Sequence, residues 1–146
     1  MKGWHPMADD AQEYIDRMVA ERGYVLDYHK VMAAADYPIL QAANTVVEAA
    51  YLTPRTLSRQ TKELLFILSL TVMQAPLPQL RSHIRVALEI GLSPQEILEA
   101  IEIALPEAGV VAFQWGVGAW QDVVGIAPLQ PTVDAYDDEG ARGSEA

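Results

Sequence analysis

Hydrophobic and polar positions follow helical spacing along most of the chain, most clearly in its central third. The ten residues Leu64–Met73 are uncharged and mostly apolar, which predicts a helix that is buried on all sides. Ser58 is a favourable N-cap for this helix, and Pro76 stops it just beyond its last turn. Pro78 can open the next helix, which Gly91 ends in a left-handed conformation. We expect the chain to be organised around these two consecutive helices.

The same spacing predicts five further helices, and no strand. They cover residues 9–23, 24–35, 38–53, 93–105 and 110–124. Ser93-Pro94-Gln95-Glu96 is a capping box with proline at the first helical position, and Pro106 ends or kinks the helix that it opens. No window combines β-branched alternation with hairpin turn residues. We predict an all-α fold, a single-domain bundle of about seven helices over residues 1–126, with an acidic tail at 127–146 that is mobile or lies along a partner subunit.

Some side-chain positions can also be predicted. Ile39 falls on the apolar face of its helix and is expected to be buried. Gly116 and Gly118 lower helix propensity, which indicates that another helix packs closely against both. His83 is expected at the edge of an apolar face, with Ser82 pointing towards water.

Charge and composition limit the kinds of partner and the cellular location that we expect for this protein. The formal net charge is −10, and no cluster of Lys or Arg is present, so neither a nucleic acid nor an anionic membrane surface is expected as a partner. The chain has no cysteine, which excludes disulfides, thiolate metal sites and thiol redox chemistry. The N-terminus lacks the apolar run of a signal peptide, and no segment has the roughly 20 apolar residues that span a bilayer. We therefore expect a cytoplasmic protein.

Glu63 and His83 are the pair of residues that could carry proton chemistry. Glu63 lies in the first turns of the central helix, where a carboxylate is also favoured by the helix dipole alone. A helix-edge histidine can likewise be purely structural, bonded to backbone or water. His5 and His29 lie on separate segments without the i, i+3 or i, i+4 spacing to acids that marks a helical metal site, so no metal is expected.

Three motifs in this region resemble a known family. They are TKELL at 61–65, LRSHI at 80–84 and ALEIGLSPQEI at 87–97. Their order is similar to that of the carboxymuconolactone decarboxylase family, and the resemblance covers roughly residues 55–109. The family belongs to a broader alkyl hydroperoxidase D-like superfamily, whose active-site pattern C-x-x-C-x-x-x-H would place cysteines where this chain has Pro76 and Gln79. Peroxidase chemistry is therefore excluded, because it requires a thiolate.

The resemblance implies an alkyl hydroperoxidase D-like helical fold, a homo-oligomer (a trimer or a hexamer) and catalysis without a cofactor. The chain departs from the family pattern at two places. Lys62 replaces the usual arginine of T-R-E-L, and Glu107 stands where the family often has tyrosine. A carboxylate in place of a phenol suggests that the substrate differs from the family's lactone.

By this analogy we expect an acid–base decarboxylase of a small carboxylated lactone or related carbonyl compound, in the breakdown of aromatic compounds. His83 would protonate carbon after carbon dioxide leaves, and Glu63 would orient the imidazole. Glu107, Trp115 and Arg81 are candidate substrate-binding residues, although Glu107 could equally be a solvated acid and Trp115 a core or subunit contact. The candidate cations for a substrate carboxylate are Lys62, Arg55, Arg59 and Arg81. The alternative hypothesis is a non-catalytic helical oligomer that keeps the family fold as a binding module.

Overall fold

The computed structural model describes residues 8–132, and every regular element in that range is helical. In chain order the elements are α1 (Ala8–Arg22), α2 (Asp27–Ala35), α3 (Tyr37–Val47), the π-helical turn η1 (Glu48–Leu52), α4 (Arg59–Val72), α5 (Leu77–Glu89), α6 (Pro94–Glu102), α7 (Ala104–Ala108) and α8 (Val110–Val124). The predicted all-α fold is confirmed. The first residues, with His5, and most of the acidic tail lie outside the described range.

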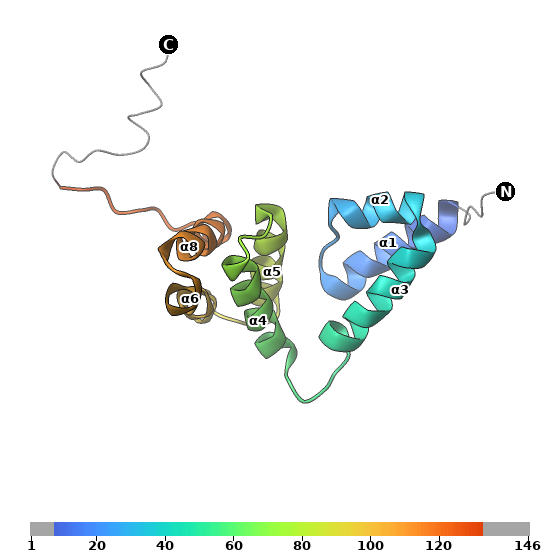
Figure 1. Ribbon diagram of the computed structural model, residues 1–146, viewed down its shortest axis with the longest axis horizontal. Coiled ribbons are helices and arrows are strands. Elements are labelled where there is room, and N and C mark those ends of the chain that lie inside the picture. Colours follow the sequence, from blue (N-terminus) through green and yellow to red (C-terminus); the bar gives the residue numbers. More distant parts are fainter. Residues whose placement is uncertain (1–7, 133–146) are drawn as a thin grey trace, which may run out of the picture.

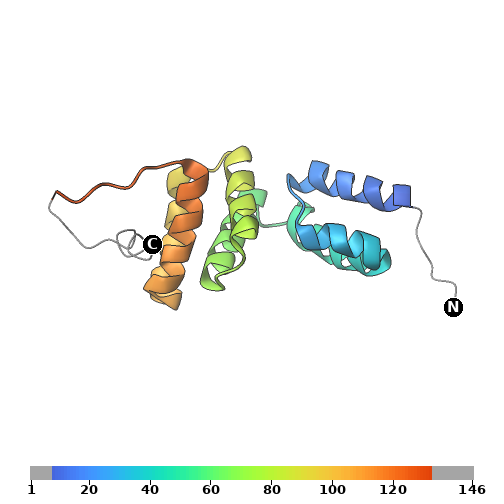
Figure 2. The same ribbon diagram turned by 90° about the horizontal axis from the view of Figure 1, so that it is seen from above.

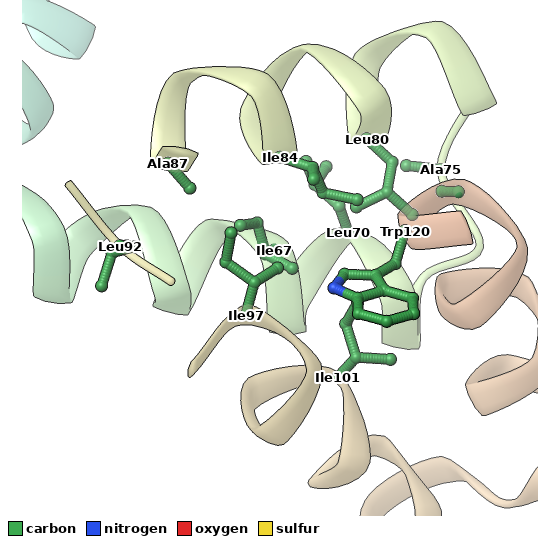
Figure 3. Packing of buried hydrophobic residues seen from close by; sticks show 11 residues of the cluster. Ile67, Leu70, Ala75, Leu80, Ile84, Ala87, Leu92, Ile97, Ile101 and Trp120 are labelled. Carbon is green, nitrogen blue, oxygen red and sulfur yellow. The ribbon is translucent and has the colours of Figure 1, made fainter. Parts of the chain in front are cut away.

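The helices form two groups, joined by the non-helical segment 53–58 (Figures 1 and 2). In the first group, α1–α3 pack around Tyr14, Ile15, Met18, Ala33, Tyr37 and Leu40. In the second group, α4–α6 and α8 bury a larger cluster, in which Ile67 of α4 and Ile84 of α5 face Trp120 (Figure 3). Each group therefore has its own apolar interior, and the candidate residues Glu63 and His83 both belong to the second group.

The ends of the helices follow the expected local chemistry. The side chain of Ser58 accepts a hydrogen bond from the backbone N–H of Thr61, which caps α4. Ser93 and Glu96 form the reciprocal bonds of the capping box that opens α6. Gly91 follows α5 with φ of +99°, a conformation that residues with a side chain rarely adopt. These three boundary predictions are confirmed.

The second helix starts later than predicted, at Asp27 instead of Tyr24. The backbone N–H of Leu26 bonds to the ring Nδ1 of His29 at 2.9 Å, so this donor is satisfied by a side chain just before the helix. Residues 24–26 remain non-helical as a result. This correction matters because the non-helical segment allows Tyr24 to reach α5.

The expectation that Leu64–Met73 is buried on all sides is wrong for the single chain. Ile67 and Leu70 are buried, whereas Leu65 is 51% exposed and Met73 is 65% exposed. The reason is geometric, because α5, α6 and α8 cover one side of α4 and leave a second apolar side open. Ile39 is exposed in the same way, because α3 buries a different face.

Two smaller predictions in the second group also need correction. Ser82 is buried instead of facing water, and its hydroxyl donates to the carbonyl of Pro78 at 2.8 Å. Close packing is confirmed at Gly116, where an added Cβ would lie 2.6 Å from Thr71 Cγ2, but Gly118 has nothing within 4 Å of that position.

The break that Pro106 predicts in the sixth helix is present. The break precedes Pro106, since α6 ends at Glu102 and α7 contains this proline. A proline at 106 has no N–H to bond the carbonyl of Glu102, which explains why one continuous helix cannot form there.

Candidate active site

Glu63 is a fully buried carboxylate on the face of α4 that meets α5. Its exposed fraction is 0%, and its Oε1 is hydrogen-bonded to Nδ1 of His83 on α5. Burial of an isolated carboxylate carries a large desolvation free energy, so such a group requires partners that donate hydrogen bonds to it. The structure therefore brings together the two residues that the sequence singled out for proton chemistry.

Aromatic side chains surround the imidazole of His83, which is 1% exposed. Phe66 stacks on it with ring centroids 4.8 Å apart and an interplanar angle of 13°. The rings of Tyr24 and Tyr51 lie against it at centroid distances of 5.0 and 5.9 Å. Bulk water is thus kept away from the ring, which strengthens the electrostatic interactions made there.

Tyr51, on the π-helical turn η1, is the second partner of Glu63. Its hydroxyl donates to Glu63 Oε2. Burial, and then the adjacent carboxylate, raise the pKa of Tyr51 well above its ordinary value of 10, so the phenol stays protonated as a donor. Single π-helical turns often occur at functional sites, and this one presents Tyr51 to the buried acid.

Tyr24 occupies the remaining nitrogen of the imidazole. Its hydroxyl oxygen lies 3.2 Å from His83 Nε2, and the side chain is half-buried. Burial raises the pKa of Tyr24 to about 12, so this phenol is also neutral at ordinary pH. Tyr24 is therefore the group of the network that connects the buried imidazole to the outer surface.

The donors and acceptors form a consistent chain when Glu63 is ionised. An ionised carboxylate only accepts, so the Tyr51 hydroxyl and His83 Nδ1–H both donate to it. With its proton on Nδ1, a neutral His83 has a lone pair on Nε2, which accepts from the Tyr24 hydroxyl. If His83 gains a proton, Nε2–H donates to Tyr24 instead. The network can therefore hold or release one proton at Nε2 without losing a hydrogen bond.

Arg59 is the cation that lies nearest to this network. Its Nη2 donates to the Tyr51 hydroxyl at 3.3 Å, its Nε lies 4.0 Å from Glu63 Oε2, and its guanidinium is 4.7 Å from the Tyr51 ring centroid. The side chain also lines a surface groove of about 340 Å³, together with Glu21, Glu48, Leu52 and Thr53. A groove of this volume is within the range of small-molecule sites.

The other predicted substrate-binding residues have their contacts elsewhere. Arg81 forms an ion pair with Asp122 of α8 at 3.0 Å. Trp115 donates its indole N–H to the carbonyl of Ala75 at 2.9 Å, between α8 and the α4–α5 connection. Glu107 lines an apolar groove of about 350 Å³ with residues of α4 and Ile103. The described contacts do not link these three residues with Glu63 and His83, so a substrate role for them stays a prediction.

The sequence missed Tyr24, Tyr51 and Phe66 as members of this site. Phe66 follows Glu63 by one helical turn, and that spacing could have placed it beside the acid. Tyr51 and Tyr24 carry no comparable signal, because their approach depends on the π-helical turn and on the non-helical segment before α2.

Within residues 8–132, no three His, Asp or Glu side chains gather in a group that could hold a metal ion. The same part of the chain contains no helix with the length and apolar character needed to cross a bilayer.

Comparison with models of known families gives a match. The model of the carboxymuconolactone decarboxylase family matches residues 38–122, which run from the start of α3 into the last turn of α8. None of the curated proteins compared with the chain matches it. The matched region contains Tyr51, Glu63 and His83, whereas Tyr24 lies before it.

Proposed function

Because the chain belongs to the carboxymuconolactone decarboxylase family, we propose that it is a cofactor-free acid–base enzyme that decarboxylates a small carboxylated lactone or a related carbonyl compound. The observation that carries this proposal is the buried pair of Glu63 and His83, with a phenol on the free ring nitrogen. A cytoplasmic location is part of the same proposal.

The chemistry needs a proton donor at one point. When the bond to the substrate carboxylate breaks, its electron pair enters the conjugated carbonyl and forms an enolate, and carbon dioxide leaves. Carbon must then take up a proton, which an imidazolium at His83 can supply through Nε2. Glu63 stabilises that imidazolium and fixes the orientation of the ring. A proton from solvent restores the acid afterwards, so the whole reaction consumes one proton.

Tyr24 would act between His83 and the substrate. Its hydroxyl occupies Nε2, so a substrate either displaces it or receives the proton through it. A neutral phenol can also donate a hydrogen bond to the developing enolate oxygen, a type of contact worth about 10² to 10³ in rate. The family's usual tyrosine is absent at Glu107, and Tyr24 offers a phenol from a different segment.

Arg59 is the best-supported cation for the substrate carboxylate. It lies beside the network and lines a groove of suitable volume. Arg81 is already paired with Asp122, and Lys62 Nζ bonds the carbonyl of Thr53 at 3.3 Å. A planar guanidinium also binds a carboxylate through two parallel hydrogen bonds, which an ammonium cannot.

A non-catalytic binding module is the second candidate, and the burial of His83 favours it. The ring is stacked on Phe66 and covered by Tyr24, which is also what a purely structural buried pair would look like. Such a pair specifies one packing arrangement without any turnover.

Turnover assays separate the two candidates. The wild-type protein would be incubated in D₂O with a panel of carboxylated lactones and β-keto acids, and both carbon dioxide release and deuterium incorporation into the product would be measured. We expect at least one compound to react, and to react far more slowly with the His83→Asn variant. Equal rates for the wild-type protein and this variant across the panel would reject the proposed function and favour the binding module.

A further inference from the structure

Arg22, in the last turn of α1, has a guanidinium that is buried without a carboxylate partner. The residue is 3% exposed, and its buried Nε and Nη2 atoms have no hydrogen-bond partner among residues 8–132. None of the ion pairs found in residues 8–132 includes it. Buried donors without an acceptor are unfavourable, so these two atoms indicate that a small acceptor binds beside them.

A small cavity lies beside this guanidinium, within the first group of helices. It has a volume of about 30 Å³ and is lined by Arg22, Tyr28, His29, Leu40, Ala43, Asn44 and Val47. A cavity of this order holds water-sized groups and is far smaller than the site of a drug-sized ligand. A small planar anion such as formate or bicarbonate is of the right scale for it.

Asn44 gives the cavity a second unsatisfied group. Its Nδ2 donates to the hydroxyl oxygen of Tyr14 and to Oε1 of Glu48, both at 2.7 Å, which fixes the orientation of the amide. Within the part of the chain that the structure describes, the amide oxygen Oδ1 is buried without a partner. An occupant would therefore have to accept hydrogen bonds from Arg22 and, directly or through a water molecule, donate one to Asn44.

His29 does not neutralise the site. Its Nδ1 accepts the backbone N–H of Leu26, so the ring proton is on Nε2. Burial, together with the positive charge of Arg22, lowers the pKa of His29 to about 4, which leaves the ring neutral at ordinary pH. Glu48 is the carboxylate nearest in the bonding network, but it is held by Asn44 and forms no ion pair with Arg22.

We propose that the cavity beside Arg22 binds a small carboxylate of the size of formate or bicarbonate. Bicarbonate fits best, because its oxygens accept from the guanidinium while its O–H can donate to Asn44 Oδ1. The site is distinct from the Glu63–His83 pair. Arg22 lies before the part of the chain that the family model matches, whereas the α3 residues of the cavity lie within it. It does not depend on the proposed function.

Thermal unfolding in different salts tests this proposal. We expect formate and bicarbonate to raise the unfolding midpoint of the full chain with a saturating dependence on concentration, as a ligand of the folded state does. Sulfate at the same ionic strength should not produce that saturation. The Arg22→Met variant should lose the response and, without these ions, should unfold no earlier than wild type, because its buried unpaired charge is gone. The matched control is Arg85→Met, which removes an exposed arginine from the second group of helices and should keep the full response.

A direct measurement covers the case in which Arg22→Met fails to fold. In the wild-type protein labelled with ¹⁵N, one arginine Nε–H resonance should shift with formate concentration and reach a plateau at the concentration that saturates the unfolding midpoint. The absence of any saturating arginine shift would overturn the proposal, as would an equal response of the midpoint to sulfate. If formate binds only after the tail acids Asp134, Asp137 and Asp138 are changed to Asn, the site holds a carboxylate of the chain itself, and the proposed free ligand is wrong.

Discussion

Tyr24 and His83 are 59 positions apart in the chain, yet the phenol oxygen of one lies 3.2 Å from Nε2 of the other. Tyr24 belongs to the group of helices before the 53–58 connection, and His83 belongs to the group after it. The contact therefore joins the two groups at the candidate active site.

The first prediction concerns this contact. Tyr24→Phe keeps the ring against His83 but removes the hydroxyl from Nε2, so turnover of a reactive compound should fall by about 10² to 10³. The free energy of unfolding should fall by only about 0.5 to 1.5 kcal/mol, the net value of one hydrogen bond. The comparison is Tyr28→Phe, which alters an exposed phenol nearby and should change neither quantity. Turnover unchanged in Tyr24→Phe would show that the phenol takes no part in the reaction.

The second prediction is that Glu63 and His83 act as one unit. His83→Asn and Glu63→Gln should each lower turnover by about 10² to 10⁴, and the double variant should be little slower than the slower single variant. Each single variant also leaves a buried partner unsatisfied, which should cost about 1 to 3 kcal/mol of stability. Urea unfolding measures this loss of stability. It also identifies the conditions in which each variant is folded, and turnover rates should be measured there.

The control for this pair is Glu102→Gln, which changes an exposed acid on α6. It should affect neither rate nor stability. Multiplicative losses of turnover in the double variant would contradict a single proton-transfer unit.

The third prediction concerns acid pH. The pKa of His29 is lowered from 6.5 to about 4 in the folded protein, so the folded state resists protonation of this ring. The stabilising contribution is present above pH 6.5 and is lost as the pH falls towards 4. His29→Gln can keep an acceptor for the Leu26 N–H, and its stability should depend less on pH in this window. Chemical unfolding of both proteins at several pH values makes the comparison, and parallel curves would contradict the assignment.

The fourth prediction uses two glycines on α8. Gly116→Ala would place a methyl group 2.6 Å from Thr71 Cγ2 and 2.7 Å from Ile101 Cγ2, so overpacking should cost about 1 to 3 kcal/mol. Gly118→Ala meets nothing within 4 Å and should instead stabilise the helix by up to about 1 kcal/mol. Equal effects of the two substitutions on the unfolding midpoint would show that α8 does not pack as described.

The fifth prediction is the homo-oligomer, which we propose to be a trimer or a hexamer. Leu65, Met73 and Ile103 are at least half exposed and line one groove of about 350 Å³ with Glu107. Contiguous exposed apolar surface of this kind commonly marks an interface. Light scattering should give three or six chain masses for wild type and a smaller mass for Met73→Glu. A monomer mass for wild type at micromolar concentration would contradict the proposal.

The part of the fold that depends on local chemistry could be predicted from the sequence. Ser58, Ser93 and Gly91 act through neighbours a few positions away, so their effect on the helix ends is visible in one stretch of sequence. Glu63 and His83 were found because a carboxylate beside an apolar run and a nearby histidine are unusual. The pair could thus be predicted without knowing how the helices cross.

The rest of the site depends on long-range packing. The sequence predicts Tyr24 within a helix, because nothing in its own segment shows that the His29 ring accepts a hydrogen bond from the Leu26 N–H. The burial of Leu65 and Met73 was overestimated for a related reason, since apolar residues on all sides of α4 do not reveal which side the chain itself covers. The burial of Arg22 could not be predicted either, because it results from the packing of three helices and not from the sequence around Arg22.

The separate apolar interiors of the two helical groups have a consequence for how such proteins can diversify. The family match begins at residue 38, so α1, α2 and the Tyr24 segment lie outside the part of the chain that defines the family. An evolving chain could replace this leading segment, and with it the group that meets the imidazole, while the helices that hold Glu63 and His83 keep their packing. Residues that contact His83 would then change at the N-terminal end of the chain, with Glu63 and His83 inherited unchanged.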